Sequence, residues 1–271
     1  MRTRIDRVSV PVATRAPTGR TNAYLVGETD ALLVDPPART DELDEAVADR
    51  EVAHVAVTHT HPDHVGAVAD YAAETGATVW ARRGREDRFE AATGVRPDRT
   101  FGEGTEIAVG DGRVEVLDAP GHAPDHVAFA VGGDVLCGDL AVAEGSVVVG
   151  APEGDVRAYL TALRRLHARD PSRLLPGHGP VIDDPRATLV RLIRHRLDRE
   201  RRVLAAVREG ASDPDAILDA AYDKDLGGVR DLARATVVAH VEKLAHEGKV
   251  ALDGAGSGWG TPGDGATVRP R

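Results

Sequence analysis

Short apolar runs, each ending at a glycine, a proline or a polar residue, fill the first two thirds of the chain. They predict strands within residues 4–34 and 105–136, and single strands over 52–57 and 78–81. Apolar residues at helical spacing predict helices between these strands, at residues 40–50, 63–74 and 85–92, and a further helix after them, at 155–168. Sheets followed by helices, twice over, predict an α+β fold in which two β-sheets form a sandwich covered by outer helices.

The pattern changes after Pro185. An arginine-rich helix is predicted over residues 187–209, followed by helices over 216–222 and 232–247 and a short strand over 250–252. This order is typical of a winged-helix domain. We therefore expect three parts: a main domain over 1–184, a small helical, winged-helix-like domain over 185–253, and a disordered, glycine-rich tail over 254–271.

The arginine-rich helix allows two interpretations. Its arginines could form a solvated face with Asp198 and Glu200 as ion-pair partners, or a charged wall beside a cleft. We favour the solvated face.

Composition limits the classes of function. The net charge of −10 provides no overall attraction for nucleic acid, and aromatic residues make up only 3% of the chain. The sequence has no apolar run long enough for a membrane span, no apolar signal region at its start and a single cysteine. These features predict a cytoplasmic protein without an internal disulfide.

The segment from His59 to His64, His-Thr-His-Pro-Asp-His, is the strongest chemical signal in the chain. It places four possible metal ligands, His59, His61, Asp63 and His64, within six residues. Imidazole and carboxylate are the ligands that suit zinc and neighbouring first-row metals. A polar surface loop is a poor alternative, because the whole chain has only 11 histidines.

Three further candidate ligands follow apolar runs at glycine-marked turns. They are His122 after Pro120-Gly121, Asp139 after Gly138, and His178 after Gly177. The ends of strands often present functional side chains from loops. Together with the first cluster, they complete a set of seven.

These motifs resemble the metallo-β-lactamase superfamily of metal-dependent hydrolases. The segments around Pro120–His126, Gly138–Ser146 and Leu175–Ile182 are similar to its β-lactamase-like protein 2 branch, which carries a winged-helix-like C-terminal domain. The resemblance covers residues 8–252.

The resemblance implies a binuclear centre. His59, His61 and His122 would bind one metal, Asp63, His64 and His178 the second, and Asp139 would bridge the two. We expect two zinc ions, with iron or manganese as competitors, and a metal-activated hydroxide as the nucleophile. Asp63 would also have a catalytic role, in orienting that hydroxide.

Other polar residues receive supporting roles. Asp35, at the end of an apolar run, is expected to make hydrogen bonds behind the ligands, as are Asp125 and His126. Cys137 is predicted to be a buried small apolar residue. The remaining histidines lack ligand spacing and are predicted to be ordinary surface or helix residues: His54, His167, His195, His240 and His246.

Two substrate classes compete. The β-lactamase-like protein 2 resemblance implies cleavage of single-stranded RNA, although the chain offers no aromatic run for base stacking. The alternative is a small-molecule ester or thioester, as for hydroxyacylglutathione hydrolases, although we find no basic C-terminal pair of the kind that binds glutathione. A winged-helix regulator that only senses metal is a third possibility, disfavoured by the complete ligand set.

Overall fold

The computed structural model describes residues 3–223, 226–253 and 267–271. The chain divides into two compact units. The first comprises residues 1–119, 125–145 and 166–188, and the second comprises 120–124, 146–165 and 189–271. The predicted domain boundary at residue 185 stays a prediction; the second unit also takes two segments from the middle of the chain.

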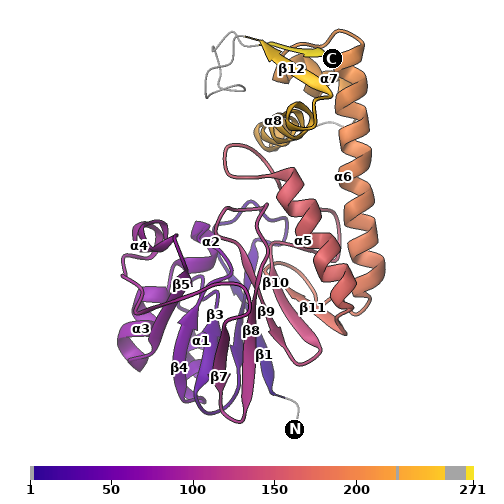
Figure 1. Cartoon of the computed structure of the whole chain (residues 1–271). Coiled ribbons are helices and arrows are strands. Elements are labelled where there is room, and N and C mark those ends of the chain that lie inside the picture. The colour runs from indigo at the N-terminus through magenta and orange to yellow at the C-terminus, as the bar shows by residue number, and fades with distance from the viewer. Residues whose placement is uncertain (1–2, 224–225, 254–266) are drawn as a thin grey trace. The chain divides into compact units, whose positions relative to one another are not determined.

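The first unit contains two mixed sheets (Figure 1). The first sheet has six strands in sequence order: β1 (Ile5–Pro11), β2 (Arg20–Val26), β3 (Ala31–Val34), β4 (Val52–Ala56), β5 (Thr78–Arg82) and β6 (Arg99–Phe101). The second has five strands in the order β11 (Arg173–Pro176), β10 (Asp134–Gly138), β9 (Val127–Val131), β8 (Gly112–Asp118) and β7 (Glu106–Val109).

The direction of the strands determines where the loops that carry the candidate ligands lie. Strands β3 to β6 run parallel to one another, and so do β10 and β11. Parallel neighbours end at the same edge of a sheet. The segments that follow β3 and β4 are therefore brought together, as are those that follow β10 and β11.

The inner faces of the two sheets share one apolar core. Leu32 and Val34 of β3 pack in the same cluster as Val116 of β8, Phe129 of β9 and Leu136 of β10. All of these side chains are fully buried. This burial of inner faces is what joins the two sheets into a sandwich.

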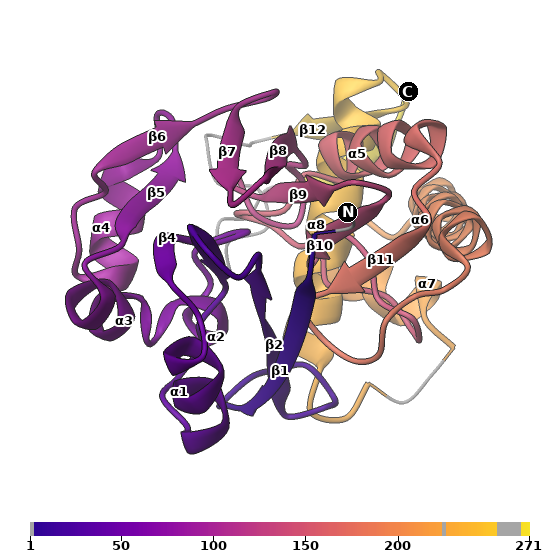
Figure 2. The same cartoon turned by 90° about the horizontal axis from the view of Figure 1, so that it is seen from below.

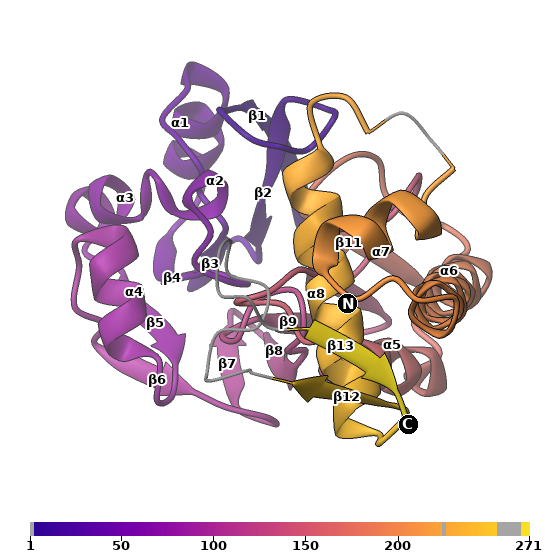
Figure 3. The same cartoon turned by 90° about the horizontal axis from the view of Figure 1, so that it is seen from above.

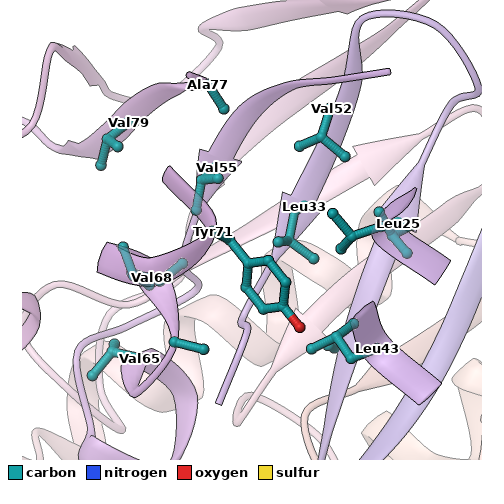
Figure 4. Packing of buried hydrophobic residues seen from close by; sticks show 14 of the residues in the cluster. Leu25, Leu33, Leu43, Val52, Val55, Val65, Val68, Tyr71, Ala77 and Val79 are labelled. Carbon is teal, nitrogen blue, oxygen red and sulfur yellow. The ribbon is translucent and has the colours of Figure 1, made fainter. Parts of the chain in front are cut away.

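Helices cover the outer face of the first sheet. They are α1 (Asp41–Ala48), α2 (Pro62–Val65), α3 (Val68–Thr75) and α4 (Glu86–Thr93). Leu33 and Val55 pack against Leu43 of α1 and against Val68 and Tyr71 of α3, as Figure 4 shows. Figure 2 shows α1, α3 and α4 on one side of this sheet and the second sheet on the other. Strand β3 is buried at every position because both of its faces are covered.

The helix predicted over residues 63–74 is two helices in the structure. Helix α2 ends at Val65 and α3 begins at Val68. The break lies where the backbone of Gly66 approaches Pro37: a Cβ on Gly66 would lie 2.3 Å from the Pro37 carbonyl oxygen. The close approach of the two backbones allows only glycine there.

The second unit is mainly helical. It contains most of α5 (Val156–Arg169) and α6 (Pro185–Arg208), together with α7 (Pro214–Ala221), α8 (Arg230–His246), β12 (Val250–Asp253) and β13 (Thr267–Pro270). Apolar residues of α6, α7, α8 and the two strands form one cluster, which includes Val207, Leu218 and Val241. Figure 3 shows the antiparallel strands β12 and β13 next to α8. This C-terminal helical region agrees with the predicted elements, while the winged-helix identification stays a prediction.

The disordered tail predicted over 254–271 is wrong for its last residues. Thr267–Pro270 form β13, which pairs antiparallel with β12 in the register Val250↔Pro270. Val268 is buried in the helical cluster, and this burial stabilises the strand. Residues 254–266 lie outside the described residues.

The α+β fold class is confirmed by these mixed sheets and helices. In the part of the chain that the structure describes, no helix combines the length and hydropathy needed to cross a membrane.

Candidate metal centre

The ligand loop follows β4 and leads into α2. Pro62 occupies the first position of α2, where the missing backbone N–H costs no hydrogen bond, and His61 precedes it in an extended conformation. Nε2 of His59 lies 2.9 Å from Nδ1 of His61. The two rings therefore turn a nitrogen toward the same point, as the spacing of two residues predicts.

Asp35 holds this loop from the end of β3. Its carboxylate accepts hydrogen bonds from the Thr58 backbone N–H at 2.6 Å and from the Thr58 hydroxyl at 2.7 Å. It also lies 3.0 Å from Nδ1 of His64. Because a carboxylate is an acceptor, Nδ1 of His64 carries a proton, and in the neutral ring Nε2 therefore carries the lone pair that a metal needs.

Six of the predicted ligands lie in the first unit. Ligand atoms of His59, His64 and Asp139 lie within 4.8 Å of one another, and so do those of Asp63, His64 and His178. Nε2 of His178 is 3.5 Å from a carboxylate oxygen of Asp63 and 3.5 Å from one of Asp139. These separations are too long for strong direct pairing and suit groups that share a cation.

The second sheet brings Asp139 and His178 together. Asp139 follows β10, His178 follows β11, and Gly138 pairs with Pro176 across these parallel strands. Gly177 leaves the space that the site needs, because a Cβ there would lie 2.7 Å from Cε1 of His64 and 2.8 Å from Oδ1 of Asp139. A side chain on this residue would fill the space between the ligands.

The surroundings of Nε2 of His64 show whether a metal ion suits this site. Nε2 of His64 is buried and has no hydrogen-bond partner among the described residues, and Oδ1 of Asp139 lies 3.7 Å away. A buried polar atom without a partner is rare and calls for a water or an ion. A divalent cation bound by His64 and Asp139 satisfies both atoms.

The charges around His64 and His178 also favour the binding of a cation. Burial would lower the pKa of His64, but the nearby carboxylates of Asp35, Asp139 and Asp63 outweigh it and raise the pKa to about 9. The pKa of His178 is also raised, because Asp139 outweighs the effect of burial. The site therefore holds an excess of negative charge that attracts cations.

Strand β2 supports the His178 loop through residues that the sequence did not single out. The Asn22 side-chain amide donates to the carbonyls of Pro176 and Gly179, each at 2.9 Å, and its backbone N–H donates to Gly177. Nδ1 of His178 donates to the Arg20 carbonyl at 2.8 Å, which leaves Nε2 as the ligand nitrogen. An asparagine directly before the apolar run of Ala23–Val26 is the signal that could have identified Asn22.

Asp125 and His126, predicted to support the ligands by hydrogen bonds, contact the loops that carry the ligands. Nε2 of His126 accepts a hydrogen bond from the backbone N–H of Asp139 at 3.0 Å. Asp125 accepts one from the Thr60 hydroxyl at 2.7 Å and lies 3.4 Å from the Arg88 guanidinium. His126 and Asp125 are both buried.

Asp63 has a contact that the sequence did not suggest. The hydroxyl of Thr14, in the loop between β1 and β2, donates to Oδ2 of Asp63 at 2.5 Å. This bond orients the carboxylate. A threonine in a polar loop carries no recognisable signal in the sequence.

His122 lies in the segment 120–124, which belongs to the second unit. Its Nδ1 donates to the Val148 carbonyl at 2.7 Å, so Nε2 carries the lone pair. The tautomer is the one a ligand needs. Its assignment to the first metal stays a prediction.

Cys137 is fully buried, as predicted for a small apolar residue. Burial raises the pKa of its thiol well above the usual range. A protonated, inaccessible thiol is a poor nucleophile.

Comparison with known proteins agrees with this geometry. Residues 16–178 match the family described as the metallo-beta-lactamase superfamily. A metallo-beta-lactamase family protein from Thermus thermophilus has a similar fold, with a TM-score of 0.77, 23% identity and coverage of 98% of both chains.

Two curated relatives are also similar. The beta-lactamase-like protein 2 homolog of Caenorhabditis elegans is 28% identical over 201 residues, which are 70% of this chain and 66% of the relative. An atrochrysone carboxyl ACP thioesterase of Aspergillus chevalieri is 29% identical over 204 residues, 70% of this chain and 61% of the relative. The chain thus spans less than two thirds of the length of each.

Proposed function

The chain belongs to the metallo-β-lactamase superfamily of metal-dependent hydrolases, and we propose that it hydrolyses a small-molecule ester or thioester with two metal ions. The observation that carries the metal centre is the buried Nε2 of His64, which faces Asp139 and has no hydrogen-bond partner in the part of the chain that the structure describes. We propose His59, His61 and His122 for one metal, Asp63, His64 and His178 for the other, and Asp139 as the bridge. Zinc suits this set, and iron or manganese would bind the same donors.

When bound, the two ions would supply an acidified water as nucleophile and polarise the oxygen of the scissile group. The chain's own residues position this chemistry. Asp63, held by Thr14, would orient the attacking water and accept its proton. Asp35 and the Arg20 carbonyl keep His64 and His178 in the tautomers that leave Nε2 available.

Two features support an acyl substrate over single-stranded RNA. One of the relatives is named a thioesterase. Among the described residues, Val229 is the one large apolar side chain that is exposed, and no aromatic ring is exposed for base stacking. Binding of single-stranded nucleic acid usually depends on such rings.

RNA cleavage is the second candidate, because another relative is named a beta-lactamase-like protein 2 homolog. The same metal centre could serve either reaction, since metal-activated water attacks both carbonyl and phosphoryl groups.

The experiment offers metal-loaded protein a panel of acyl thioesters and a labelled single-stranded RNA. We expect thioester hydrolysis that falls at least about 100-fold in Asp63→Ala. Asp70→Ala, which removes an exposed carboxylate from α3, is the matched control and should keep full activity. RNA cleavage without thioester turnover would establish the second candidate in place of the first, and absence of bound metal would refute both.

A further inference from the structure

Arg196, on α6, is buried although it carries a full positive charge. Only 2% of its surface is accessible to solvent. The guanidinium donates to the Val147 carbonyl and lies 5.3 Å from the centre of the Tyr159 ring. The solvated face expected for this part of the helix is therefore wrong at Arg196.

Arg199 lies three residues further along α6, on the same side of the helix. Its guanidinium stacks on Tyr222 at 3.4 Å from the ring centre and donates to the Ala221 carbonyl at 3.0 Å. Carbonyls and aromatic rings thus contact both arginines, but none of these groups carries a negative charge.

The nearby carboxylates pair with other cations. Glu200 is 2.5 Å from Lys243 and 3.3 Å from Lys249. In the same way, Asp198 pairs with Arg201, and Asp223 pairs with Arg202. Asp198 thus pairs with an arginine of this helix, as expected, whereas Glu200 pairs with lysines instead. Among the described residues, neither Arg196 nor Arg199 has an ion pair.

The energies do not balance without a counter-ion. A cation–π contact returns only a small part of the free energy that a cation loses when it leaves water. Buried charges are therefore normally paired with a charge of opposite sign. Arg196, which is buried, and Arg199, which is half-buried, therefore carry positive charge that no carboxylate among the described residues balances directly.

His240, on α8, is a second and independent sign of a missing partner. It is fully buried, and neither of its ring nitrogens has a hydrogen-bond partner among the described residues. Burial lowers its pKa well below the usual range, and the charges of Arg196, Arg199, Lys243 and His195 lower it further. A histidine so close to these cations has two polar atoms ready for a ligand.

We propose that the second unit binds the phosphate group of a ligand through Arg196, Arg199 and His240. Guanidinium groups match the oxygens of phosphate in pairs, and charge-assisted hydrogen bonds to phosphate are among the strongest in proteins. A bound phosphate neutralises both arginines and accepts a hydrogen bond from a ring N–H of His240. None of these three residues belongs to the proposed hydrolytic centre, so this proposal does not depend on that centre.

The test follows the ring of His240 by nuclear magnetic resonance in the full-length, metal-loaded protein. The ring is titrated with pH at constant ionic strength, with and without inorganic phosphate. We expect phosphate to raise the pKa of His240 by about one unit or more, because a nearby anion favours the charged form. Phosphate bound at the metal centre would not produce this change, since the readout is local to His240.

Variants distinguish the site from a general salt effect. Arg199→Gln, at a half-buried position, should abolish the phosphate-induced shift, and Arg196→Gln should do the same if it folds. Arg201→Gln, at an exposed position that pairs with Asp198, is the matched control and should keep it.

Parallel titrations identify the anion. Methyl phosphate should act like inorganic phosphate if the site takes phosphate carried on a larger molecule, and a response to inorganic phosphate alone would assign it to the free ion. An equal response to acetate would overturn the assignment to phosphate. A His240 titration that phosphate leaves unchanged, or that responds equally in Arg199→Gln, would overturn the site itself.

Discussion

Replacing Asp35 by asparagine should damage the metal centre without touching a ligand. The carboxylate accepts three hydrogen bonds, two from Thr58 and one from Nδ1 of His64. Asparagine keeps the size, and it tolerates the positive φ of 51° at this position. Its oxygen can still accept from the Thr58 backbone, but its NH₂ group cannot accept from His64. We expect Nδ1 of His64 to become the acceptor, so that Nε2 gains the proton and no longer binds metal.

The magnitude follows from the bonds that are lost. A hydrogen bond to a charged group contributes about 1.5–3 kcal/mol, and loss of a residue that orients a metal ligand typically costs about 10–100-fold in metal affinity. We therefore expect Asp35→Asn to retain the fold, with lower stability, and to bind the metal at His64 about 10–100-fold more weakly. Isothermal titration of metal-free protein with zinc measures this affinity. Asp30→Asn, at an exposed residue that also has a positive φ, is the control.

The same variant changes how the metal-free protein responds to pH. The pKa of His64 is raised from 6.5 to about 9, chiefly because Asp35 outweighs the opposing effect of burial. A group whose pKa is raised by folding stabilises the protein fully below its unfolded value, and that stability is lost as pH rises through the folded value. Metal-free wild-type protein should therefore lose stability in urea between about pH 6.5 and about pH 9. This loss should be smaller in Asp35→Asn. Equal zinc affinities and equal pH profiles for the Asp35 and Asp30 variants would refute the reasoning.

Three further predictions concern the same centre. Asn22→Ala removes two side-chain hydrogen bonds to the loop of His178 and should destabilise the protein by about 1–3 kcal/mol in urea unfolding; an unchanged midpoint would contradict this support role. Gly177→Ala places a methyl group against His64 and Asp139, so metal analysis should find less than the wild-type metal content; wild-type content would show that the space is not needed. Chelation should lower the thermal midpoint and abolish hydrolysis, and added zinc should restore both, because a ligand that binds only the folded state stabilises it; chelation without any change in midpoint would argue against a structural contribution of the metal.

The sequence predicts much of this fold because local patterns carry the information. Apolar runs locate β4, β10 and β11, the last two ending at glycine, and the run His59 to His64 marks the ligand loop. The break at Gly66 is not local. It arises because the backbone of Pro37, far back in the chain, occupies the space beside it.

The supporting contacts of the centre could not be predicted for the same reason. Thr14 contacts Asp63 across 49 positions, and Asn22 contacts Pro176 across 154. Single polar residues of these types are common and serve many roles. Their partners are determined by strand pairing and packing, which no short segment encodes.

The amino-acid order alone determined which side chains can bind metal, because imidazole and carboxylate chemistry belongs to the residue whatever its surroundings. Only the tertiary structure decided the tautomers of His64 and His178, since these depend on Asp35 and the Arg20 carbonyl from other strands. It also decided that Arg196 is buried, although its sequence context predicts a solvated helix face. Burial and ion pairing depend on neighbours that folding brings together, and the electrostatic energy of a charged side chain depends on those neighbours.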